Sequence, residues 1–95
     1  MTPLTPGIAY MAQVEYDRVV CHRVTVNTVT EKQVKVVSGS ATYYRTTLPL
    51  AEAMRSGLRA TEREAWDSLR ERLTEQRDRL ASELATVNAR ISEVP

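Results

Sequence analysis

The feature that most limits how this chain can fold is a long segment without helix breakers, which runs from Thr61 to Val94. No glycine or proline occurs in it before Pro95, and it is dominated by Leu, Ala, Arg and Glu, all of which favour helices. Thr61, with Glu64 three residues later, is a capping box that stabilises a helix start by about 1 kcal/mol. The segment therefore predicts one long amphipathic helix over residues 61–94.

The predicted helix carries a narrow apolar stripe with coiled-coil-like spacing. With Trp66 taken as heptad position a, every a position is apolar, and from Leu80 onward the e position replaces the d position as its apolar neighbour. On a straight helix these side chains lie within roughly 80° of one another, a width typical of a coiled coil or of an antiparallel helix pair. We predict an oligomer interface made of Trp66, Leu69, Leu73, Leu80, Leu84, Val87, Ile91 and Val94.

Two hypotheses compete for this stripe. In the first, the helix folds back onto its own sheet and the protein is a monomer. In the second, a second copy or another protein covers the stripe. A three-stranded sheet is about 15 Å wide, whereas a helix of this length spans about 50 Å, so part of the stripe would overhang the sheet. The overhang favours the second hypothesis, with a dimer as the simplest closed assembly and a trimer or tetramer still open. We expect residues 61–76 to pack near the sheet and residues 80–94 to hold subunits together.

The residues before the helix predict a β-meander. Pro3 and Pro6 indicate a flexible lead-in over residues 1–12, because proline fixes φ and lacks an amide donor. Alternating β-branched residues from Val14 to Val29 predict one long strand, with a bend or bulge near Cys21–Arg23.

Two further strands and a connector complete the predicted fold. The expected segments are a polar turn at 30–33, a strand at 33–37, a turn at 38–40, a strand at 41–48 and a connector over 49–60 with a short helical turn at Leu50–Arg55. Together they predict a single α+β domain, in which a three-stranded antiparallel meander over 13–48 is followed by one long C-terminal α-helix.

Arginines beside the stripe are candidates for binding an anion. Arg63, Arg70 and Arg77 occupy successive e positions, and guanidinium groups bind phosphates and carboxylates through paired hydrogen bonds. In an oligomer they would form a cationic slot for an anionic nucleotide between arginines of neighbouring subunits. In the competing interpretation their stems cover the stripe and their charges pair with nearby acidic residues, namely Asp67, Glu71, Glu75 and Asp78.

No constellation in the sequence predicts catalysis, a metal site or a cofactor. Cys21 and His22 are adjacent on a predicted strand, so their side chains point to opposite faces and cannot form a nucleophile–base dyad. No CxxC pair or second histidine accompanies them. A basic sheet face for weak nucleic-acid binding is a further hypothesis, based on Arg18, Arg23, Lys35 and Arg45 with Tyr43 and Tyr44.

The overall charge indicates which classes of partner are not favoured by electrostatic attraction. The formal net charge is +1, which provides no general attraction to nucleic acid or to an anionic membrane. The single cysteine cannot form an internal disulfide, and no run of about eighteen apolar residues predicts a membrane span. We therefore expect a cytoplasmic protein.

The order of motifs is similar to one seen in small reading frames of bacteriophages and GC-rich bacteria. It consists of VTEKQVKV at the first turn of a meander, a T-x-x-E-A helix start and a helix rich in Arg, Glu and Leu. This resemblance transfers no site residues. It implies a phage accessory protein, in a bacterial or infected host cell, that binds a host protein, a structural partner or a small signalling nucleotide. The predicted function is that of a non-enzymatic, homo-oligomeric interaction protein.

Overall fold

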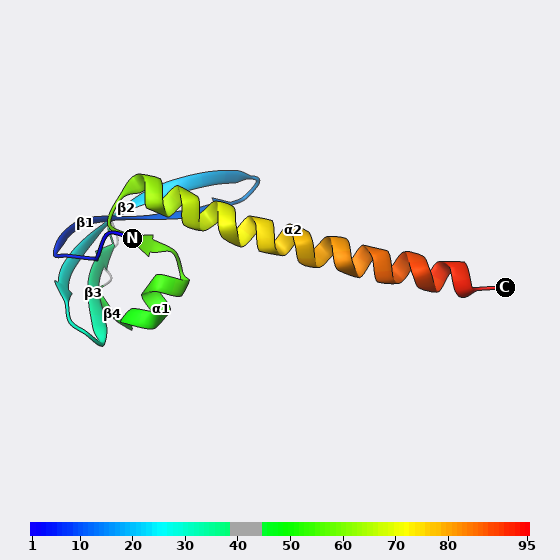
Figure 1. Ribbon diagram of the computed structural model, residues 1–95. Coiled ribbons are helices and arrows are strands. Elements are labelled where there is room, and N and C mark those ends of the chain that lie inside the picture. The colour runs from blue at the N-terminus through cyan, green and yellow to red at the C-terminus, as the bar shows by residue number, and fades with distance from the viewer. Residues whose placement is uncertain (39–44) are drawn as a thin grey trace.

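The computed structural model describes residues 1–38 and 45–95, which form a small sheet with one short and one very long helix (Figure 1). The molecule is elongated, with principal extents of 61 × 28 × 22 Å, because the long helix projects well beyond the sheet. In chain order the elements are β1 (Gly7–Glu15), β2 (Arg18–Val29), β3 (Gln33–Ser38), β4 (Arg45–Pro49), α1 (Leu50–Arg55), β5 (Leu58–Arg59) and α2 (Glu62–Glu93).

The predicted α+β class is confirmed, but the sheet formed by the described residues has five strands rather than three. The strand order is β4-β3-β2-β1-β5, and every neighbouring pair is antiparallel. The first four strands follow one another as a meander. The short β5 returns to the free edge of β1, the first strand of the chain. It therefore places the start of α2 beside β1.

The prediction of a flexible lead-in over residues 1–12 was wrong from Gly7 onward. Residues 7–15 form β1 and pair with β2 along its whole length, from Gly7↔Val26 to Glu15↔Arg18. Both early prolines precede the strand, so neither removes a donor from the ladder. The predicted long strand over 14–29 is in fact divided at Tyr16 and Asp17, where Tyr16 adopts a left-handed φ of 55°.

The predicted bulge lies further along β2 than expected. The β2–β3 register shifts between Val26 and Thr28, and not near Cys21–Arg23, where pairing with β1 is continuous. An extra residue of this kind strengthens the local twist of a strand. The bulge therefore bends the part of β2 that pairs with β3, and the long β1–β2 hairpin stays regular.

Other predicted segments agree with the structure. The turn at 30–33 is present, and there the Thr30 hydroxyl accepts a hydrogen bond from the Gln33 amide at 3.0 Å. The strands at 33–37 and 41–48 correspond to β3 and to the overlapping β4, and α1 matches the predicted helical turn at Leu50–Arg55. Residues 39–44, with most of the predicted turn at 38–40 and with Tyr43 and Tyr44, lie outside the described residues.

The sheet is covered by a different helix on each face. Cross-strand partners share a face, and neighbouring residues alternate between faces. On one face, α1 contributes Ala53 to a core with Ala9, Val26, Val34 and Leu58. On the other face, α2 contributes Ala65 and Leu69 to a second core with Ala12. We call these the α1 face and the α2 face.

The start of α2 follows the predicted cap only in part. The Thr61 hydroxyl accepts a hydrogen bond from the Glu64 amide at 3.2 Å, as a capping box requires. The Glu64 carboxylate, however, turns to the N-terminal segment, where its Oε1 accepts hydrogen bonds from the Thr2 amide at 2.9 Å and the Thr2 hydroxyl at 2.8 Å. Glu64 therefore ties the N-terminal segment to the first turn of α2.

Candidate interaction site on the long helix

The structure divides the apolar stripe of α2 into a packed and an exposed half. In the proximal half, Leu69 is only 5% exposed and Trp66 is half-buried, while Leu73 marks the boundary at 38%. In the distal half the stripe residues keep between 47% and 70% of their surface exposed; they are Leu80, Leu84, Val87, Ile91 and Val94. We call these five residues the distal stripe.

Small residues allow the proximal half to lie close to the sheet. Ala12 on β1 and Ala65 on α2 are both fully buried, and Leu69 completes their cluster. Tyr10 and Cys21 pack at its margin. The burial of Cys21 raises the pKa of its thiol, with the Glu62 carboxylate adding to the effect. The expectation that residues 61–76 pack near the sheet is confirmed only as far as Arg72, because the residues from Leu73 to Gln76 are exposed.

Arg72 anchors the proximal half by a contact that the sequence did not reveal. Its Nη2 donates a hydrogen bond to the Ala12 carbonyl at 2.8 Å, on the edge of β1 just beyond the short β5. Gly57 makes room for this guanidinium, because a Cβ atom there would lie 2.5 Å from Nη2. Gly57 also has a φ of 92°, a conformation that favours glycine. In the sequence, Arg72 is indistinguishable from the neighbouring arginines.

A hollow opens beside the proximal half, before the distal stripe begins. Its volume is about 420 Å³, and its lining combines apolar side chains with two guanidinium groups; the residues are Val19, Trp66, Leu69, Arg70, Leu73, Thr74 and Arg77. A few polar groups on an apolar wall are typical of a small-molecule site. The hollow is built from the first turns of α2 and the start of β2.

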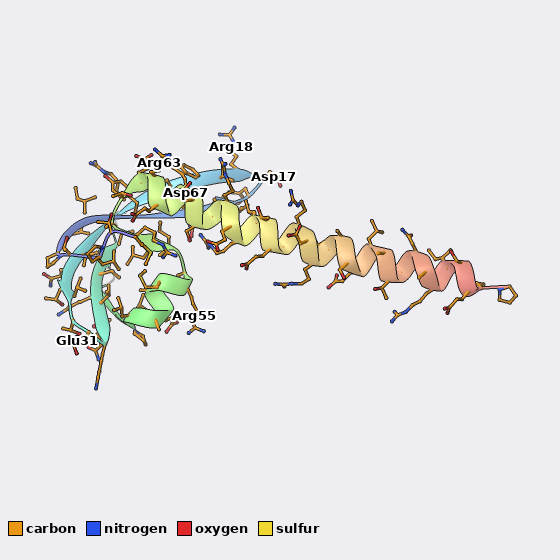
Figure 2. The ribbon with its side chains drawn as sticks, viewed as in Figure 1. Asp17, Arg18, Glu31, Arg55, Arg63 and Asp67 are labelled. Atoms are coloured by element: carbon orange, nitrogen blue, oxygen red, sulfur yellow. The ribbon has the colours of Figure 1, made fainter. Side chains whose placement is uncertain are left out.

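Two of the three predicted anion-binding arginines meet at this hollow. Arg70 and Arg77 line it, whereas Arg63 lies near the helix start, over the sheet (Figure 2). Arg77 also forms an exposed ion pair with Asp78, with 3.2 Å between Nη2 and Oδ1, so the predicted pairing with acidic neighbours is observed at this position. An anion entering the hollow would compete with Asp78 for Arg77.

Cys21 and His22 do not act together. Cys21 pairs with Ala12 on the α2 face, while His22 pairs with Met11 on the α1 face. His22 Nε2 lies 2.6 Å from Glu15 Oε1, and Gln13 Nε2 donates to the same oxygen at 2.5 Å. The hydrogen bond from His22, followed by that from Gln13, lowers the pKa of Glu15. Within the described residues, no group of His, Cys, Asp or Glu side chains is arranged to hold a metal ion.

The predicted basic sheet face is split by the register. Arg18 pairs with Glu15 on the α1 face, while Arg23 pairs with Tyr10 on the α2 face. Lys35 pairs with Thr28, which places it on the same face as Arg23. The sheet therefore does not bring Arg18 and Arg23 to one surface.

Comparisons with known proteins assign the chain to no family. The chain matches no family model, and no curated protein or solved structure is significantly similar to it. Among the described residues, no helix is both long enough and apolar enough to cross a membrane. In the part of the chain that the structure describes, α2 thus carries an exposed apolar stripe from Leu80 onward and a hollow that lies before it, between Trp66 and Arg77.

Proposed function

We propose that this protein is a non-enzymatic, homo-oligomeric interaction protein in which the distal half of α2 holds the copies together. One observation carries the proposal: the distal stripe is a continuous apolar surface on a helical segment that extends away from the rest of the chain (Figure 1). Exposed apolar surface of this kind marks an interaction site, and oligomers usually close by symmetry around it.

The area available is enough for a reversible assembly. Fully burying one large aliphatic side chain contributes about 1.5–3 kcal/mol, and the distal stripe residues are already partly covered. Summed over two helices, the gross gain is on the order of 10 kcal/mol, which exceeds the lower estimates of the cost of association, about 4 kcal/mol, by about 6 kcal/mol. We therefore expect self-association with a dissociation constant in the micromolar range.

Absolute mass in solution tests the proposal. Light scattering across a range of micromolar concentrations is expected to show a mass that rises from that of one 10.7 kDa chain to a multiple of it. Ile91→Asp is expected to keep the chain monomeric, because it places a charge inside the stripe. Ala89→Asp is the matched control, since Ala89 is exposed on the opposite side of the same helix. A chain that stays monomeric at the highest concentration contradicts the proposal.

The second candidate function is the sequestration of an anionic nucleotide, and it is favoured by the hollow that Arg70 and Arg77 line together with Trp66. In this function the ring of the ligand stacks on Trp66 while its phosphates meet the guanidinium groups. A nucleotide that binds should raise the melting temperature, and the rise should disappear in the double variant Arg70→Ala/Arg77→Ala. Arg79→Ala is the control, because Arg79 does not line the hollow. If no nucleotide in a panel raises the melting temperature, this candidate is eliminated.

We propose a biological setting on the basis of the resemblance to small phage reading frames. In that setting the assembly acts in the cytoplasm of a bacterial or infected host cell. Its sheet and its hollow would then be the surfaces that bind a host protein or a nucleotide, while the distal stripe is occupied by self-association. Co-purification of a defined host protein with the wild-type chain, but not with a hollow variant such as Trp66→Arg, would test this division of surfaces.

A further inference from the structure

The distal stripe is self-complementary about its central residue, Val87. Leu80 precedes Val87 by seven residues and Val94 follows it by seven, while Leu84 and Ile91 lie about equally far on either side. We propose that the occupant of the stripe is a second copy in the antiparallel direction, related by a twofold axis that passes beside Val87. This inference rests on the proposed self-association and adds to it a direction, a register and a charge pair.

The charged residues beside the stripe fit the same axis. Glu83 and Arg90 are seven residues apart, so they lie on one edge of the stripe, about 20° from each other around the helix. In an antiparallel pair the same edges of the two helices meet. A twofold axis near Val87 therefore places Glu83 beside Arg90 of the other copy, and the symmetry repeats this ion pair.

A parallel pair would not form these ion pairs. In parallel packing, opposite edges of the two helices meet. The other edge of the distal stripe carries Ala81 and Asn88, which are uncharged. Parallel packing therefore sets Glu83 and Arg90 against uncharged side chains, whereas antiparallel packing about Val87 sets them against each other.

The overlap also agrees with the shape of the molecule. Residues 80–94 span about 21 Å of helix, so the contact begins beyond the hollow and beyond the sheet. The two sheets then lie at opposite ends of a rod-like dimer, and neither blocks the other. Both hollows remain open, because Arg77 is the last residue that lines them.

A charge exchange tests the register. Glu83→Arg and Arg90→Glu are each expected to weaken dimerisation by about tenfold, since each change replaces two ion pairs by two repulsions. The double variant Glu83→Arg/Arg90→Glu is expected to regain an affinity within about threefold of wild type, as in a double-mutant cycle. Ala85→Arg is the control, because it adds a positive charge within the overlap on the opposite side of the helix, roughly 140–160° from Glu83 and Arg90.

Disulfide trapping tests the direction. In a Cys21→Ala background, a mixture of the Leu80→Cys and Val94→Cys chains is expected to form mixed disulfides on mild oxidation. Leu80→Cys alone is expected to form few, because its two sulfurs would be about 21 Å apart along the axis. Efficient trapping of Leu80→Cys alone would overturn the antiparallel direction in favour of a parallel pair.

The outcomes separate this inference from the proposed function. A monomeric mass for the wild-type chain removes both. A mass of three chains, or a dimer in which the exchanged double variant stays as weak as the single ones, removes the twofold register and leaves self-association in place. Circular dichroism of each variant at a concentration well below the dissociation constant shows whether the helix itself has been preserved.

Discussion

The two halves of α2 differ in what surrounds them, although one apolar stripe runs through both. The proximal half is held by the sheet through Ala65, Leu69 and Arg72, whereas the distal half carries equally large aliphatic side chains on an unsupported helix. The difference shows that a regular apolar stripe does not define one kind of contact. Which part of the stripe is buried depends on where the short strand β5 pairs with β1, because that pairing fixes the start of α2 on the sheet.

The largest expected difference between the halves is in stability. Leu69→Asp is expected to lower the free energy of unfolding by about 3 kcal/mol or more, because it buries a charge beside Ala12. Leu84→Asp is expected to change it by less than about 0.5 kcal/mol in the monomer, yet to abolish self-association. Urea unfolding at low protein concentration, combined with light scattering at high concentration, measures both effects. Equal effects of the two variants on the free energy of unfolding and on self-association would show that the halves do not differ in this way.

A smaller effect is expected from releasing the anchor of the proximal half. Arg72→Ala removes the hydrogen bond to the Ala12 carbonyl and is expected to lower the free energy of unfolding by about 1.5–3 kcal/mol. Gly57→Ala is expected to be destabilising by about 1–3 kcal/mol, since it forces a positive φ on alanine and displaces the same guanidinium. Arg79→Ala should be nearly neutral in the same urea titration, and a loss as large as that of Arg72→Ala would mean that charge, not the anchor, is responsible.

The helix cap is expected to contribute less again. Thr61→Ala removes the acceptor of the Glu64 amide and is expected to cost about 1 kcal/mol. Thr61→Ser keeps the hydroxyl and should retain most of the stability. Thermal unfolding followed by circular dichroism compares the two. If alanine and serine behave alike at this position, the cap is not a source of stability for the proximal half.

The smallest expected effect is a dependence on acid pH. Hydrogen bonds from the backbone and then from the side chain of Thr2 hold the pKa of Glu64 below its ordinary value of 4.5. A carboxylate with a lowered folded-state pKa stabilises the fold fully above its unfolded pKa, and this contribution disappears as the pH falls through the folded-state pKa. The melting temperature is therefore expected to decrease below about pH 4.5. Glu64→Gln should remove part of this decrease, whereas Glu71→Gln, on an exposed position of the same helix, should leave it intact.

The sequence predicted those elements whose signals are local. The α2 start follows from Thr61, α1 from Pro49 and Leu50, and the β2–β3 turn from the polar residues after Val29. The turn between β1 and β2 was not predicted, because its residues, Tyr16 and Asp17, include neither the Gly nor the Asn that usually indicates a left-handed turn. The two-residue β5 exists only through its pairing with β1, so no local pattern could indicate it.

The candidate site was predicted about as far as helix periodicity allows. Periodicity placed Trp66 and Leu84 on one stripe and Arg70 and Arg77 on one edge, but it could not say that the sheet would cover only the first turns. Nor could it separate Arg72 from the other arginines. That distinction depends on the carbonyl of Ala12 and on the missing side chain of Gly57, which lie far from Arg72 in sequence.

The position of Trp66 gives the molecule an internal optical reporter. It is the single tryptophan of the chain and lines the hollow at the proximal end of the stripe. Its fluorescence should therefore respond when a ligand fills the hollow, and should stay unchanged when two copies join through residues 80–94. Emission spectra recorded along a dilution series and along a nucleotide titration would thus report the two kinds of binding as separate signals from the same wild-type sample.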